Sequence, residues 1–214
     1  QAICDYLSKF DLSYSPEEET LVTVGVSEAL DLAIRAVVTP GDEVIYHEPA
    51  FVAYAPLITF AHGVPVSVTT RREDNFHLRR EALEAVVTDR TRALLINFPT
   101  NPTGAIMRED ELREIAQFAI DHDIVIITDE IYAELTFGEK HVSIAKLPGM
   151  KERTILLNGL SKAWAMTGFR IGYACAPHDL IEAMMKIHQY SMMCAPVLSQ
   201  KGAEEALRGT QKDV

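Results

Sequence analysis

Residues 92–128 read RALLINFPTNPTGAIMREDELREIAQFAIDHDIVIIT, and this stretch decides the fold class. An apolar run, Arg92–Asn97, leads into a turn rich in proline, which is typical of a buried strand. Acidic residues then open a segment with apolar residues at helical spacing, namely Leu112, Ile115, Ala116, Ala119 and Ile120. A second apolar run follows at Ile124–Thr128. The stretch therefore predicts a strand, a helix and a second strand parallel to the first.

The same alternation continues on both sides of this unit. Short apolar runs with turn signals between them predict strands, mostly buried on both faces, at Leu21–Val24, Glu43–Tyr46, Val64–Val68, Arg92–Asn97, Ile124–Thr128, Thr154–Leu157 and Ile171–Cys175. Apolar residues at helical spacing also predict a helix that ends before Pro40-Gly41 and a late helix over Pro196–Leu207. We expect an α/β fold with a largely parallel sheet covered by helices.

Composition and charge exclude several classes of protein. The chain has 214 residues, of which 48% are apolar and 24% charged, the balance of a soluble globular protein. Acidic residues outnumber basic ones by 31 to 20, and the net charge of −11 repels phosphate backbones and anionic lipid. We therefore expect neither nucleic acid nor a membrane as a partner.

The cysteines indicate no covalent or metal framework. Cys4, Cys175 and Cys194 lie far apart, with no CxxC pair and no histidine at ligand spacing, which favours a reducing compartment. The same spacing indicates no metal site. No apolar run is long enough to cross a bilayer, so we expect a cytoplasmic protein. The sequence opens on Gln1 rather than methionine, and we expect it to be part of a longer polypeptide.

Ligands of open α/β sheets bind where the strands end, so the residues after each predicted strand are the candidates for function. Five such segments carry polar or glycine residues: Gly25–Ala29, Glu48–Phe51, Asn97–Gly104, Asp129–Tyr132 and Asn158–Lys162. We expect them to converge on one edge of the sheet.

The segment after the first strand has three interpretations. A helix starting at Gly25-Val26-Ser27 would offer free backbone N–H groups and a positive dipole end to a phosphate. Ser27 is alternatively a plain helix N-cap. The segment also resembles the GxSxG turn of hydrolases, with Ala29 in the last place, but none of the histidines follows a strand in a motif that suggests a partner.

Three of the remaining strand ends also have an ordinary structural interpretation. Asn101 lies in a turn with two prolines, and Asp129, with Tyr132 three residues later, is either a helix N-cap or a buried carboxylate that needs a cationic partner. Lys162 is by itself most simply a solvated side chain, and Arg170 follows eight residues later. Taken together, a carboxylate, a lysine and a helix end suited to phosphate describe a site for pyridoxal 5'-phosphate (PLP).

Three motifs carry a resemblance to a known family. Asn-Pro-Thr-Gly at 101–104, Asp-Glu-Ile-Tyr at 129–132 and Ser-Lys-Ala-Trp-Ala-Met-Thr-Gly-Phe-Arg-Ile-Gly at 161–172 resemble the class I/II, fold-type I PLP-dependent aminotransferases. The likeness covers residues 20 to 205 and is closest to the aspartate/aromatic-type branch, which includes N-acetyl-diaminopimelate aminotransferases. It implies a three-layer sandwich with a mixed, mainly parallel seven-stranded sheet.

The same resemblance implies a domain plan. Residues 1–19 form an incoming helix and connector, and residues 20–214 form most of the PLP-binding large domain. The family's N-terminal segment and its C-terminal small domain are expected to be absent from this sequence.

The resemblance also implies the catalytic roles. Lys162 would form the internal Schiff base with PLP and then move a proton between the substrate α-carbon and the cofactor. Asp129 would pair with the pyridine nitrogen and keep the ring an effective electron sink. Tyr132 and Asn101 would bond the phenolic oxygen, and Asn101 would also face the substrate.

Four further positions are implied to hold the cofactor. Phe51 would stack on the pyridine ring. The Val26 and Ser27 amides and the guanidinium of Arg170 would bind the phosphate, because a guanidinium fork suits that charge.

This sequence departs from the family pattern in places that bear on substrate and phosphate binding. Gly159 stands where many members carry a hydroxyl residue, and Ser27 stands where some dicarboxylate-specific members carry a lysine. The arginine that binds the substrate carboxylate, and a tyrosine that reaches the neighbouring subunit, belong to family segments absent here. The identity of the amino donor and acceptor is therefore left open.

The implied activity is transfer of an amino group from an L-amino acid to a 2-oxo acid, in a homodimer. A carbon–sulfur β-lyase of the same fold shares these residues and is the nearest alternative. A ligand-sensing module, like the aminotransferase-like domains of some transcription regulators, is a second alternative, but the sequence carries no basic DNA-binding region.

Overall fold

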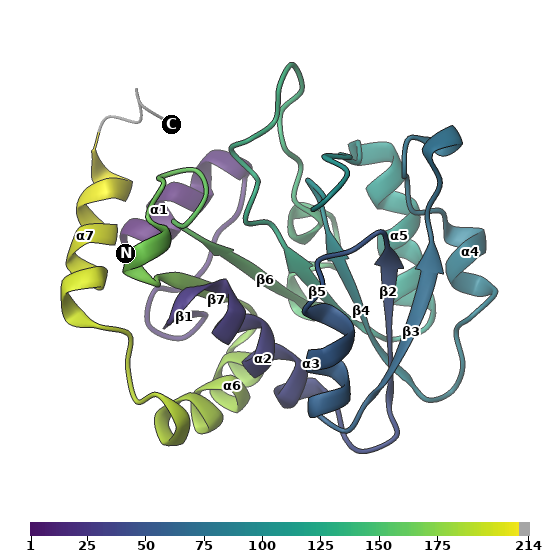
Figure 1. Ribbon diagram of the computed structural model, residues 1–214, viewed down its shortest axis with the longest axis horizontal. Helices are drawn as coiled ribbons and strands as arrows, with labels where there is room; N and C mark the ends of the chain where they lie inside the picture. The colour runs from purple at the N-terminus through teal and green to yellow at the C-terminus, as the bar shows by residue number, and fades with distance from the viewer. Residues whose placement is uncertain (210–214) are drawn as a thin grey trace.

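The computed structural model describes residues 1–209 and has one seven-stranded sheet at its centre (Figure 1). The strands are β1 (Thr20–Thr23), β2 (Glu43–Glu48), β3 (Val64–Thr69), β4 (Thr91–Asn97), β5 (Val125–Asp129), β6 (Thr154–Gly159) and β7 (Gly172–Cys175). Their order across the sheet is β1-β7-β6-β5-β4-β2-β3. All seven predicted strands are therefore confirmed, while residues 210–214 of the predicted 20–214 domain lie outside the described part of the chain.

The direction of the strands places one edge of the sheet at the functional segments. β2, β3, β4, β5 and β6 run parallel to one another, and β7 runs antiparallel to both β6 and β1. Six strands consequently point the same way and only β7 is reversed, which confirms the mixed, mainly parallel sheet. The start of β7 thus lies beside the carboxyl ends of β1 and β6, where Gly172 pairs with Thr23 and Gly159.

Helices cover both faces of the sheet and make the three predicted layers (Figure 1). One face carries α2 (Gly25–Val37), α3 (Tyr54–Phe60) and α6 (His178–Ser191), and the other carries α1 (Ala2–Leu7), α4 (Arg80–Glu84), α5 (Glu109–Asp121) and α7 (Val197–Arg208). Short 3-10 helices lie at Ser8–Phe10, Arg72–Asp74, Ile144–Lys146, Lys151–Arg153 and Thr167–Phe169. Within residues 1–209 we find no helix with the length and apolarity needed to cross a membrane.

The sheet core follows the twofold alternation of strand side chains. In β4, Leu95 packs with α2 and α3 on one face, whereas Leu94 and Ile96 pack with α5 on the other. Such strands are buried on both faces, as their continuous apolar sequence predicts. The helices inferred from Leu30–Val37 and from the spacing after Arg108 are confirmed as α2 and α5.

Two sequence expectations about the strands are corrected. β3 is not buried on both faces: it is one of the two edge strands, and Val64 and Ser67 are exposed. The strands β2, β5 and β6 also run further than predicted, to Glu48, Asp129 and Gly159. These three residues and Asn158 therefore lie within strands rather than after them. Ladder pairing with β3, β4 and β7, respectively, extends each strand past its apolar run.

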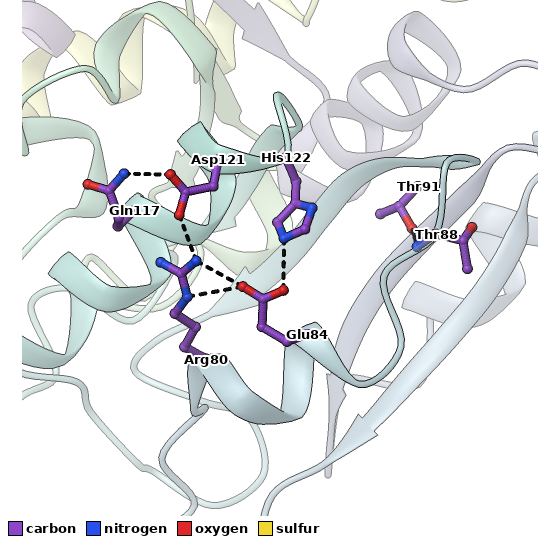
Figure 2. Close-up of polar contacts among 7 residues, drawn as sticks. All are labelled: Arg80, Glu84, Thr88, Thr91, Gln117, Asp121 and His122. Atoms are coloured by element: carbon purple, nitrogen blue, oxygen red, sulfur yellow. Dashed lines mark hydrogen bonds and ion pairs between the residues drawn. The ribbon is translucent and has the colours of Figure 1, made fainter.

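A polar network joins α4 to α5 at the far side of the sheet (Figure 2). Arg80 donates to Glu84 at 2.9 Å and to Asp121 at 2.6 Å, and His122 contacts Glu84 at 2.9 Å. Gln117 donates to Asp121 at 2.8 Å. These side chains are partly exposed, so the network links α4 to α5 but contributes little to the stability of the fold.

Candidate active site

One cavity, at the carboxyl edge of the sheet, is lined by all the residues predicted to take part in catalysis or cofactor binding. These residues are Val26, Ser27, Phe51, Asn101, Asp129, Tyr132, Lys162 and Arg170. They come from segments that follow β1, β2 and β4, from the end of β5, and from the segment between β6 and β7. They meet because the parallel strands end at one edge and the reversed β7 begins there.

The carboxylate of Asp129 lines this cavity and is buried. Its Oδ2 accepts a hydrogen bond of 2.9 Å from the Tyr54 hydroxyl, and its Oδ1 accepts one of 3.2 Å from the Ile131 N–H. Burial raises the pKa of Asp129 to about 6, although these two donors and Lys162 act in the opposite direction. The N-cap interpretation of Asp129 is wrong, because the residues that follow it form turns.

The side chain of Asn97 ties two strand ends to the Asn-Pro-Thr-Gly turn. Its Nδ2 donates to the Asp129 carbonyl oxygen at 2.7 Å, and its Oδ1 accepts from the Asn101 N–H at 2.9 Å. Asn101 in turn donates to the Tyr132 hydroxyl at 3.4 Å, a long hydrogen bond. This chain of contacts holds the Asn101 and Tyr132 side chains beside Asp129.

Lys162 lies in the segment between β6 and β7 and lines the cavity with its flexible side chain. Its Nζ is 5.7 Å from the centroid of the Tyr132 ring. The residue is exposed, as the solvated-lysine interpretation expected, yet it faces the same cavity as Asp129. Exposure and a role in the cavity are therefore compatible here.

The first turn of α2 forms the opposite end of the cavity. Gly25 has φ +71°, and a Cβ there would lie 2.6 Å from Nη2 of Arg170, so only glycine lets the guanidinium approach this helix end. Arg170 itself has φ +49° and donates to the Thr167 carbonyl oxygen at 2.9 Å. A cation and the free N–H groups of a helix N-terminus together suit an anion.

Two other interpretations of Ser27 are corrected by this geometry. The helix begins at Gly25 with Val24 as its N-cap, so Ser27 lies inside the first turn and is not the N-cap. Within the described chain, the residues lining this cavity include no histidine, so the Ser-His pair of a hydrolase is not formed there.

Close packing of glycines explains why no hydroxyl residue occupies position 159. A Cβ on Gly159 would lie 2.9 Å from the Ile171 carbonyl oxygen and 3.0 Å from Cγ2 of Val26. A Cβ on Gly172 would lie 2.6 Å from the Val26 nitrogen. These glycines allow α2 to begin directly against β6 and β7.

Sequence reasoning missed two residues that organise the cavity. Tyr54 lies three residues after Phe51 and is 1% exposed, and its ring meets that of Phe51 edge-on at 5.7 Å. Asn97 is the last residue of β4, where an amide at the end of an apolar strand was a usable signal. Ser161 and Thr167 also line the cavity. Among the described residues, no group of three His, Cys, Asp or Glu side chains is arranged to hold a metal ion.

Comparison with known proteins agrees with the fold and the motifs. The family model "Aminotransferase class I and II" matches residues 1–214. The chain is 55% identical to YugH of Bacillus subtilis (strain 168), covering 100% of this chain and 56% of that protein. It is 43% identical to the aspartate aminotransferase of Pyrococcus abyssi, covering 97% and 54% of the two chains.

Solved structures give the same result. The aromatic aminotransferase from Pyrococcus horikoshii OT3 superposes with a TM-score of 0.95 at 42% identity, covering 98% of this chain and 56% of that one. The chain thus spans about half the length of the curated relatives that it matches. With a family model matched over its whole length, the chain belongs to the class I and II aminotransferases, and its sheet and helices are those of the fold-type I fold.

Proposed function

We propose that this chain forms the cofactor-binding part of a PLP-dependent aminotransferase, which moves an amino group from an L-amino acid to a 2-oxo acid. The observation that carries the proposal is the meeting of Asp129, Lys162 and Arg170 in one cavity at the sheet edge. Family membership supports the same activity and cofactor.

The residues at the two ends of the cavity fit PLP. The buried Asp129 carboxylate has a pKa raised to about 6, the mark of a negative charge that its surroundings only partly compensate. A protonated pyridine nitrogen is a cation, and it would compensate the negative charge of Asp129. At the other end, Arg170 and the first turn of α2 suit the phosphate.

When bound, PLP would supply the electron sink for the bond broken at the substrate α-carbon. Asp129 would hold the proton on the pyridine nitrogen. Asn101 and Tyr132 would donate hydrogen bonds to the phenolic oxygen, since the Asn101 amide already reaches the Tyr132 hydroxyl. Phe51, 37% exposed at the cavity wall, would cover one face of the ring.

Lys162 would hold the cofactor covalently through Nζ and then carry the proton that leaves and returns at the α-carbon. A general base must reach the proton it moves, and a long side chain in a segment beside the ring site suits that task. The exposure of Lys162 leaves its amino group accessible to an incoming cofactor.

The assembly and compartment belong to the same proposal. We infer a homodimer, supported by large apolar side chains left exposed around the end of α6 and the start of α7, among them Tyr190, Met193 and Leu198. Three free cysteines support a cytoplasmic location. The net charge of −11 supports small-molecule substrates rather than nucleic acid or membrane surfaces.

The proposal is tested by following nitrogen in the full-length protein with PLP. A panel of ¹⁵N-labelled L-amino acids is supplied with a 2-oxo acid, and the products are identified by mass spectrometry. An aminotransferase transfers the label to the new amino acid formed from the supplied 2-oxo acid and releases no ammonia. Release of pyruvate, ammonia and a thiol would instead identify a carbon–sulfur β-lyase and overturn the proposal.

A further inference from the structure

A buried pair of titratable residues, Glu28 and His188, lies just behind the phosphate-facing end of α2. Oε1 of Glu28 accepts a hydrogen bond of 2.8 Å from Nδ1 of His188, which must carry the proton because a carboxylate only accepts. The two side chains are only 10% and 4% exposed. A buried carboxylate without such a partner would be strongly destabilising, so the pair acts as one unit.

The second oxygen of Glu28 reaches the start of the same helix. Oε2 accepts a hydrogen bond from the backbone N–H of Val24, the N-cap residue of α2. Val24 directly precedes Gly25, and the amides of Val26 and Ser27 follow. The carboxylate therefore fixes the strand-to-helix corner that aims these amides into the cavity.

Through its hydrogen bond to Glu28, His188 connects the start of α2 to a distant part of the chain. It lies on α6, which packs against α2 on the same face of the sheet. Through Glu28, the position of α6 is linked to the first turn of α2. Neither Glu28 nor His188 is among the residues that line the cavity, so any influence on a ligand passes through the helix end.

We propose that Glu28 and His188 are positioning residues for the cofactor phosphate, holding the Val26 and Ser27 amides in the geometry that binds it. This inference rests on the proposed function, because it assumes that PLP occupies the cavity. Its specific content is that the pair acts on the phosphate end of the ligand and leaves the ring end, around Asp129 and Lys162, unaffected.

The chain contains a matched control for this arrangement. Glu111 at the start of α5 accepts from the Arg108 N–H at 2.8 Å and pairs through its other oxygen with Nδ1 of His77. The arrangement is similar, with the Arg108 guanidinium as an additional partner of Glu111 and both side chains more exposed, and none of the described residues lining the cavity belongs to α5. A His77 variant that loses the contact with Glu111 therefore shows how ligand binding responds when a helix start away from the cavity loses its support.

The test compares two ligands that differ only in the phosphate. Dissociation constants for PLP and for pyridoxal are measured by absorbance titration of the full-length, cofactor-free protein, in the wild type and in His188→Leu, His188→Asn and His77→Leu. We expect His188→Leu to raise the dissociation constant for PLP about tenfold, equal to about 1.4 kcal/mol. The dissociation constant for pyridoxal should stay within about twofold of the wild-type value. His188→Asn keeps an N–H near the Nδ1 position and should recover most of the PLP affinity, and His77→Leu should change neither constant.

Each outcome decides between the possibilities. Equal weakening of PLP and pyridoxal, or unchanged PLP binding in His188→Leu, would overturn the positioning role while leaving the proposed function intact. A wild-type protein that binds no PLP would overturn the proposed function and this inference with it. If His188→Leu does not fold, Glu28→Gln takes its place, with a selective loss of about threefold expected because one of the two hydrogen bonds is weakened.

Discussion

The hydroxyl of Tyr54, at the start of α3, donates a hydrogen bond of 2.9 Å to Oδ2 of Asp129, at the end of β5. Both side chains are buried. The bond stabilises the ionised carboxylate and so lowers the pKa of Asp129, against the larger raising effect of burial. Tyr54 therefore helps to keep Asp129 charged, which is the state that a pyridinium nitrogen requires.

Replacing Tyr54 with phenylalanine should expose this contribution. A hydrogen bond to a buried charged group contributes about 1.5 to 3 kcal/mol, so Tyr54→Phe should lower the free energy of unfolding of the cofactor-free protein by that amount at pH 8. The loss should be smaller at pH 5, where Asp129 is largely protonated. Urea unfolding at the two pH values measures both. Tyr46→Phe, which removes a hydroxyl that donates to Glu48 at 3.1 Å, serves as the matched control.

The tyrosine control separates the buried bond from a general effect of losing a hydroxyl. Glu48 is exposed, so its hydrogen bond should contribute well under about 1 kcal/mol, with no difference between pH 5 and pH 8. Equal and pH-independent losses in Tyr54→Phe and Tyr46→Phe would show that the Tyr54 bond does not act through the charge of Asp129.

The raised pKa of Asp129 predicts a pH-dependent difference from Asp129→Asn. Because the pKa is raised in the folded state, the stability linked to the protonated carboxyl is complete below pH about 4 and is lost as the pH rises through about 6. In the cofactor-free protein, the stability of the wild type should fall relative to Asp129→Asn by about 3 kcal/mol across this window. Urea unfolding between pH 4 and 8 measures the difference, and a flat difference would mean that Asp129 titrates normally.

Catalysis should respond more strongly than folding to the same substitution. An amide carries no negative charge to hold a proton on the pyridine nitrogen, so Asp129→Asn should lower kcat/KM by about a thousandfold, roughly 4 kcal/mol. The amide has nearly the same shape, and the fold should survive. Steady-state kinetics of the PLP-loaded protein test this, and turnover at the wild-type rate would remove Asp129 from the mechanism.

Introducing at position 159 the hydroxyl residue that many family members carry should lower the stability of this protein and weaken its PLP binding. In Gly159→Ser, the new Cβ would lie 2.9 Å from the Ile171 carbonyl oxygen and 3.0 Å from Cα of Gly172, so the backbone of β7 would have to shift. We expect a loss of about 1 to 3 kcal/mol of stability together with weaker PLP binding. Gly168→Ala is the control, because a Cβ at Gly168 meets no atom within 4 Å. A stable Gly159→Ser protein with tighter PLP binding would contradict this view of the α2 corner.

The sheet and the cavity were predictable because both follow from local sequence. Central strands that are buried on both faces show continuous apolar runs, and parallel strands bring their ends to one edge whatever the order in the sheet. That is why Asp129 and Asn101 could be assigned to one site before their contacts were known. The resemblance of residues 161–172 to a family motif added Arg170, which no strand-end argument would have chosen.

The remaining features depend on tertiary contacts that no local pattern records. Tyr54 reaches Asp129 across 75 positions of the chain, and its location follows from how α3 packs on the sheet. The exclusion of a side chain at Gly159 depends on β7 and α2 meeting there. The exposure of β3 depends on its place at an edge of the sheet. The sequence of a single strand does not determine the order of the strands in the sheet.

The lysine that binds PLP defines the active site of this protein. The full-length protein is incubated with PLP and reduced with borohydride, and the modified peptide is mapped by mass spectrometry. We predict a pyridoxyl group on Lys162, and retained non-covalent PLP binding with negligible turnover in Lys162→Ala, because Lys162 lines the cavity that holds Asp129. A pyridoxyl group on Lys140 or Lys186 instead would contradict the assignment of the site.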